Sequence, residues 1–130
     1  MAAAFASCST GSQTAQTGSI DGEWSIVEVD GSKINANNSE NAPFMGFNTK
    51  ESRVYGSTGC NRLTGAVTAD VKTGAIDLSK MGSTRMMCAN MDTENKVLGA
   101  LATVKTFKAK GKTLQLCNES GKIVIVLEKR

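Results

Sequence analysis

The chain has 130 residues, of which 40% are hydrophobic and 21% charged, and its net charge is +3. This length supports one compact domain with a single core, and the modest charge and few aromatic side chains argue against binding to nucleic acid. Histidine is absent, which removes the usual general base, the partner of Ser and Cys nucleophiles and the commonest metal ligand. We therefore expect no enzyme, no metal site and no cofactor.

The first 19 residues do not look like the start of a fold. The letters "FASC" at 5–8 resemble the end of a bacterial lipoprotein signal, whose cysteine is acylated, although Phe5 stands where Leu is usual. The polar run 9–19 has the composition of a flexible linker. We predict a clipped signal and linker over 1–19, a lipid anchor on Cys8 and a place in the bacterial cell envelope, facing the periplasm or the exterior. The alternative is an ordinary N-terminus with an incidental cysteine.

Strand patterns follow in chain order over the first half of the domain. Alternating apolar and polar residues predict strands at 23–29, 43–48, 53–56, 64–70 and 71–79. Asp30 and Gly31 supply the turn after the first of them. No segment approaches the 18 apolar residues that a membrane helix needs.

The period then changes from strand to helix. Apolar residues on a 3.6-residue stripe predict a helix near 92–104: Met91, Val97, Leu98, Leu101 and Val104. Gly99 inside it is expected to lie where another backbone comes close. Strands return at 106–110, 113–117 and 123–129, and the last is apolar on both faces, so it should be central or covered by the helix.

These elements predict an α+β fold in a single domain over 20–130. We expect a curved antiparallel sheet or partial barrel of about seven to eight short strands, with the one principal helix. The domain is expected to be a monomer.

Positive charge concentrates near the C-terminus, where residues 96–130 hold 8 basic and 2 acidic side chains. Lys105, Lys108, Lys110 and Lys112 fit solvent-facing positions of a hairpin, where lysine also discourages edge pairing. A basic face for an anionic partner or membrane is the alternative.

The stretch "GSTGCNRLTG" at 56–65 has neither phosphate-loop pattern and leads into a strand, so it does not predict a nucleotide site. The cysteines at 8, 60, 88 and 117 form no CxxC pair, which argues against zinc and against thioredoxin-like chemistry. Asp92 and Glu94 are interpreted as charges that favour the N-terminus of the helix.

Two segments together resemble the META domain family, which includes the bacterial heat-shock protein HslJ. The residues that carry the likeness are Gly59, Cys60, Asn61 and Gly65 in the first segment and Thr84, Met86 and Cys88 in the second. The likeness extends over about 19–130. It implies a secreted or lipid-anchored envelope protein associated with stress and antibiotic tolerance, without an established catalytic activity.

The motif suggests structural roles once this resemblance is accepted. Cys60 and Cys88 are candidates for a disulfide, or else two buried reduced cysteines. Cys117 is expected to be a buried spare. Arg62 and Arg85 could hold an anion together, or lie exposed near polar turns. Met81, Met86 and Met87 would line a pliable binding surface or fill the core.

The functional hypothesis is therefore a non-enzymatic, HslJ-like envelope domain, tethered by a lipid, that binds a protein or a small apolar ligand. One alternative is a protease-inhibitor-like module acting through an exposed loop near 35–43, where Pro43 and several asparagines favour a protrusion. A thiol redox enzyme using Cys60 and Cys88 is a third hypothesis, weakened by the missing CxxC and histidine.

Overall fold

The computed structural model of the chain describes residues 19–34, 43–58, 61–84 and 92–130. Within these ranges it has nine strands and one helix. In chain order they are β1 (Gly22–Val29), β2 (Ser32–Lys33), β3 (Phe44–Asn48), β4 (Arg53–Ser57), β5 (Arg62–Asp70), β6 (Ala75–Ser83), α1 (Asp92–Leu101), β7 (Val104–Lys110), β8 (Thr113–Asn118) and β9 (Ile123–Lys129).

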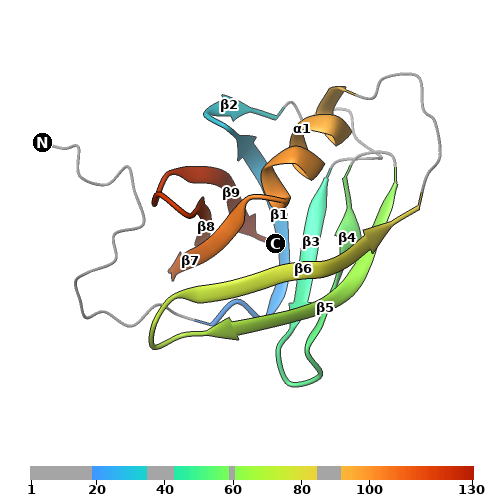
Figure 1. Cartoon of the computed structure of the whole chain (residues 1–130). Helices are drawn as coiled ribbons and strands as arrows, with labels where there is room; N and C mark the ends of the chain where they lie inside the picture. Colours follow the sequence, from blue (N-terminus) through green and yellow to red (C-terminus); the bar gives the residue numbers. More distant parts are fainter. Residues whose placement is uncertain (1–18, 35–42, 59–60, 85–91) are drawn as a thin grey trace, which may run out of the picture.

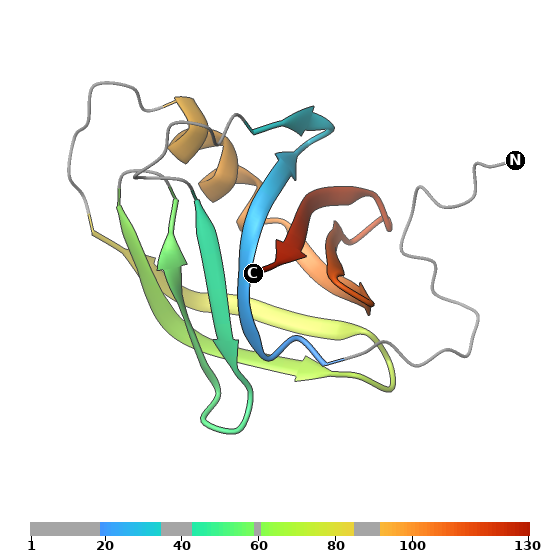
Figure 2. The same ribbon diagram turned by 180° about the vertical axis from the view of Figure 1, so that it is seen from behind.

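The strands form one antiparallel sheet that closes on itself. Each neighbouring pair in the order β1-β3-β4-β5-β6-β7-β8-β9 is antiparallel, and β9 returns to pair with β1. Eight strands thus form a barrel, and β2 is a short extension paired to β1. Figures 1 and 2 show this barrel with β2 at one end. The predicted antiparallel sheet with one helix is confirmed, and the ring of strands goes beyond the expected partial barrel.

Local sequence explains the strands and their turns. The apolar side chains of β7 and β8 alternate inward, so that Phe107, Leu114 and Leu116 are buried while Lys108 and Lys110 are exposed. At the end of β1, Asp30 and Gly31 adopt φ values of 51° and 84°, the left-handed pair that a tight two-residue hairpin requires.

Helix α1 packs on β9 and β1 and covers one end of the barrel (Figure 1). Its buried face consists of Val97, Ala100 and Leu101. The helix ends at Leu101, three residues before the predicted end, because Val104 already belongs to β7. Gly99 lies on the exposed face, where an added Cβ would meet nothing within 4 Å, so the predicted close approach at Gly99 is wrong.

The barrel is weakly paired at one seam. β6 pairs with β5 along its whole length, from Ala75 to Ser83. Its pairing with β7 is much shorter and consists of Ala75 opposite Thr106. Next to this pair, the Phe107 amide donates a 2.8 Å hydrogen bond to the Gly74 carbonyl. Beyond that point β6 and β7 diverge, and α1 leads into β7 beside the gap.

None of the helices in the described part of the chain is long and apolar enough to cross a membrane.

Candidate functional site

The glycine-rich motif forms the connection between β4 and β5. The Thr58 amide donates to the Asn61 carbonyl at 3.0 Å, which draws the two strand ends together. Thr58 and Asn61 are 0% and 1% exposed. Gly59 and Cys60 lie outside the described residues. The described part of this connection is therefore a buried polar turn.

Glu94, in the first turn of α1, holds this turn. Its Oε1 accepts a 2.6 Å hydrogen bond from the Thr58 hydroxyl and a 2.9 Å bond from the Asn61 amide, and its Oε2 accepts a 2.6 Å bond from Asn61 Nδ2. Glu94 is only 4% exposed. Three donors from one turn thus satisfy a buried carboxylate and join the β4–β5 connection to the helix.

Thr84 connects the second motif segment to the first. Its hydroxyl donates to Asn61 Oδ1 at 2.7 Å and accepts from the Arg62 amide at 3.0 Å. The Thr84 amide in turn donates to the Arg62 carbonyl at 3.1 Å. The two segments that carried the family likeness therefore meet at Asn61 and Thr84. Met86 and Cys88 lie outside the described residues.

The environment of Glu94 favours the ionised carboxylate. Burial is the largest single influence and raises its pKa, but hydrogen bonds from the Thr58 hydroxyl, the Asn61 side chain and the Asn61 amide together outweigh it, and the net effect lowers the pKa. The position in the first helical turn also favours a negative charge. A carboxylate whose two oxygens are occupied by donors and whose pKa is lowered is suited to holding structure, since a general acid or base needs a pKa near the working pH.

Gly65, the last residue of the first motif, allows two strands to approach. A Cβ at this position would lie 2.5 Å from the Lys80 carbonyl oxygen and 2.6 Å from the Met81 Cα. Real Cβ atoms do not come so close to backbone, so the β5–β6 pairing requires glycine here.

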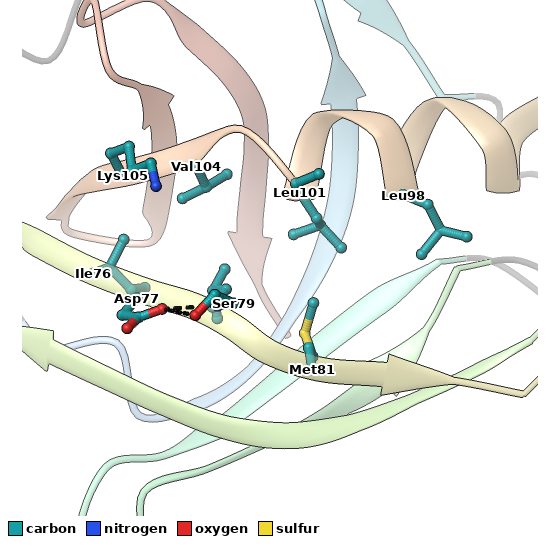
Figure 3. A pocket seen from close by; sticks show the side chains of 10 residues that line it. Ile76, Asp77, Ser79, Met81, Leu98, Leu101, Val104 and Lys105 are labelled. Carbon is teal, nitrogen blue, oxygen red and sulfur yellow. Dashed lines mark hydrogen bonds between the residues drawn. The ribbon is translucent and has the colours of Figure 1, made fainter.

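A pocket of about 610 Å³ opens at the seam between β6 and the α1–β7 connection (Figure 3). Its apolar walls combine four buried side chains, Ile76, Leu78, Leu101 and Val104, with the partly exposed Met81 and Leu98. Its volume falls within the range of small-molecule sites. Met81 lines this pocket, while Met86 and Met87 lie outside the described residues, so the binding surface of methionines stays a prediction.

The polar lining of the pocket gathers around Asp77. Its Oδ1 accepts a 2.8 Å bond from the Ser79 amide and a 2.6 Å bond from the Ser79 hydroxyl. These bonds lower the pKa of the Asp77 carboxyl, and the charges of Lys80 and Lys105 lower it further. Asp77 also occupies the amide of Ser79 on the strand that faces the gap, which protects an exposed sheet edge.

Cys117 is fully buried in β8 and is disulfide-bonded, so the expectation of a spare cysteine is wrong. It is the only cysteine among the described residues, because Cys8, Cys60 and Cys88 lie outside them. The predicted Cys60–Cys88 disulfide therefore stays a prediction. Each cysteine forms one disulfide, so if Cys8 carries a lipid, the partner of Cys117 within the chain is Cys60 or Cys88. The bridge between Cys60 and Cys88 is then excluded, because one of the two is already bonded to Cys117.

Other predicted residues are placed as follows. The four lysines of the β7–β8 hairpin are all exposed, which confirms their solvent-facing positions: Lys105, Lys108, Lys110 and Lys112. Arg62 is also exposed, whereas Arg85 lies outside the described residues, so their joint anion contact stays a prediction. The loop near 35–43 is described at Pro43 alone, which is buried and accepts a 3.1 Å bond from the Ile26 amide. Within the described ranges, no three potential ligand side chains gather as a metal site.

Two features escaped the sequence reasoning. The sequence pattern presents Glu94 only as a charge that favours the helix N-terminus, and a Glu early in a helix gives no sign of a distant turn that will bury it. The pocket was also missed, because Leu98, Leu101 and Val104 share one apolar stripe that indicates a continuous core face. Their separation from β6 depends on the weak β6–β7 pairing, which no local pattern encodes.

The comparisons with known proteins agree with this arrangement. The family model described as the META domain matches residues 16–130. No curated protein matches the chain. Among solved structures, a protein from Burkholderia xenovorans is 18% identical with a TM-score of 0.67, covering 95% of each chain. A DUF4847 family protein from Bacteroides vulgatus ATCC 8482 is 16% identical with a TM-score of 0.61, covering 85% of this chain and 94% of that one. At these identities the structural likenesses support the fold alone.

Proposed function

This chain belongs to the META domain family, and on that premise we propose that it is a non-enzymatic, HslJ-like binding domain of the cell envelope, tethered through Cys8 and active in stress or antibiotic tolerance. The ligand enters the pocket between β6 and the α1–β7 connection. The single observation that carries the proposal is this pocket of about 610 Å³, lined by both apolar and polar side chains, at the open seam of an otherwise continuous barrel.

The pocket has the features of a binding site for a small apolar molecule. Ligand sites are concave and mostly apolar, with a few polar groups that orient the ligand. Here seven apolar residues line the pocket, and Asp77, Ser79 and Lys105 supply the polar groups. Leu98 and Met81 remain partly exposed within the seam, so a ligand would bury further apolar surface there.

A tether is compatible with access to the pocket. The described chain begins at Ser19 and enters β1 at the end of the barrel away from α1 (Figures 1 and 2). The linker composition of 9–19 would let the domain stand clear of a bilayer. A membrane anchored at that end would leave the helix side of the seam facing away from the lipid.

The chemistry of the chain supports binding in preference to catalysis. It has no histidine, and the buried carboxylate of Glu94 is occupied by three donors from the β4–β5 turn. These bonds hold the β4–β5 turn to α1. The motif network would then serve to position α1 over the pocket.

Titration with the neutral fluorophore N-phenyl-1-naphthylamine tests ligand binding. The protein should bind it saturably, and Leu98→Gln should weaken the affinity about tenfold because an apolar contact of roughly 1–2 kcal/mol is lost. Val71→Gln is the matched control, since Val71 is 41% exposed in the β5–β6 turn and does not line the pocket. No saturable binding, or equal weakening in both variants, would overturn the proposal.

The tether has its own test. Protein recovered from the cell envelope should carry acyl chains on Cys8 by mass spectrometry, and Cys8→Ser should move it to the soluble fraction. An unmodified Cys8 in membrane-associated protein would contradict the anchor and leave the pocket proposal standing.

A further inference from the structure

The pocket is apolar at one end, whereas its other end combines Lys105 and Asp77 with the apolar Ile76 and Val104. Figure 3 shows Leu98 and Met81 together at one end, with Lys105 and Asp77 at the other and Leu101 between them. Such a gradient suits a ligand that is itself divided into an apolar body and a polar head.

Lys105 is the available group at the polar end. It is exposed, and its ammonium makes no hydrogen bond or ion pair with another side chain in the described ranges. Asp77 is partly engaged, because its Oδ1 accepts hydrogen bonds from both the amide and the hydroxyl of Ser79, and as a carboxylate it offers a head group no donor. An incoming head group would therefore meet three unused N–H donors on Lys105.

The local charge also favours an anion. The charges of Lys80 and Lys105 both help to lower the pKa of the Asp77 carboxyl, and of these two lysines Lys105 lines the pocket. A cationic head at the Lys105 side of the pocket would meet repulsion from the Lys105 ammonium. An anionic head would complete the charge balance of the group.

We propose that the pocket binds a small anionic amphiphile, such as a single-chain fatty acid, with its head group at Lys105 and its apolar body along Leu101, Leu98 and Met81. The inference rests on the proposed function and names the ligand class of the same site. Lys105 sets the preference for the anion, and the apolar walls supply most of the affinity.

Displacement of N-phenyl-1-naphthylamine by decanoate and by 1-decanol tests this head-group preference at neutral pH. The two competitors share one chain and differ in the head group. On the unaltered protein decanoate should displace the fluorophore at about three- to fivefold lower concentration than decanol, as expected for an exposed ion pair. The preference should shrink at high salt.

Lys105→Gln should abolish the preference for decanoate and leave displacement by decanol unchanged. Lys108→Gln, on the same strand but outside the pocket lining, should keep the preference. Equal displacement by both competitors, or an undiminished preference in Lys105→Gln, would overturn the inference while fluorophore binding still supports an apolar site. Failure of the fluorophore itself to bind would overturn the proposed function and this inference together.

Discussion

The carboxylate of Glu94 accepts a 2.6 Å hydrogen bond from the side-chain amide of Asn61, a residue 33 positions earlier in the chain. This contact joins the glycine-rich turn of the barrel to its helix. Because the Asn61 side chain also accepts from the Thr84 hydroxyl, it links both segments of the family motif to α1.

Glu94→Gln should lower the free energy of unfolding by about 2–3 kcal/mol. The new amide turns one acceptor into a donor that faces the donors of Thr58 or Asn61, and a buried donor is left without a partner. Chemical denaturation at pH 7 measures the loss. Glu119→Gln removes the same charge from an exposed turn and should change stability by less than about 0.5 kcal/mol. Equal losses in the two variants would show that the Glu94 contacts contribute nothing.

Exchanging the two groups should restore part of this stability. Asn61→Asp alone places a second carboxylate beside Glu94 and should destabilise strongly. When Asn61→Asp is combined with Glu94→Gln, the introduced carboxylate can accept a hydrogen bond from the introduced amide. The double variant should therefore be more stable than the sum of the single effects predicts, by about 1 kcal/mol or more in a double-mutant cycle. Simple additivity of the two changes would refute the direct contact.

Acid should weaken the protein partly through Glu94. The folded state lowers the pKa of this carboxyl below its ordinary value of 4.5. Its contribution is therefore fully present above the unfolded pKa and is lost as the pH falls through the lower folded pKa. Denaturation midpoints between pH 7 and pH 3 should decline more steeply for the unaltered protein than for Glu94→Gln. The pKa values of Asp21 and Asp77 are also lowered, and both groups make the unaltered protein and Glu94→Gln less stable in acid to the same extent. Equal declines of the denaturation midpoint in the two proteins would therefore contradict the role of Glu94.

Two glycines should respond oppositely to alanine. Gly65→Ala forces a Cβ against the Lys80 carbonyl and should cost about 1–3 kcal/mol. Gly99→Ala meets open space on an exposed helical face and should stabilise by about 1 kcal/mol. Thermal unfolding of both variants measures the contrast. Destabilisation by Gly99→Ala would mean that the helix is packed differently at this face.

Peptide mapping without reduction should find Cys117 in a disulfide-linked peptide. A lipid anchor on Cys8 requires the partner to be Cys60 or Cys88, because an acylated cysteine has no sulfur free for a disulfide. A link between Cys117 and Cys8 would contradict the anchor. A free Cys117 thiol under denaturing conditions would contradict its disulfide.

Much of the fold follows from local patterns, and the rest depends on contacts between distant residues. Alternation predicted the strands around Phe107 and Leu114, and the Asp30–Gly31 turn followed from its preference for positive φ. Closure of the barrel depends on pairing β1 with β9, strands about a hundred residues apart. The helix end was misplaced because the apolar stripe continues through Val104 into β7, where the same residue serves a strand.

The candidate site divides in the same way. Asn61 and Thr84 were identified through the family likeness, and the structure brings them together at 2.7 Å. Glu94 was missed because the turn that buries it lies 33 residues earlier in the chain, whereas the sequence around Glu94 has the pattern of an ordinary helix N-terminus. The pocket arises from the divergence of β6 and β7 after Ala75, which depends on the placement of α1.

Backbone amide chemical shifts of the isotope-labelled full chain, followed during titration with decanoate, test the central claim most directly. Ligand binding in the seam predicts saturable shifts at Leu78, Ser79, Leu98, Leu101 and Lys105, with Tyr55 and Val71 unchanged. Shifts confined to other surfaces, or none at concentrations below micelle formation, would contradict a ligand site between β6 and α1.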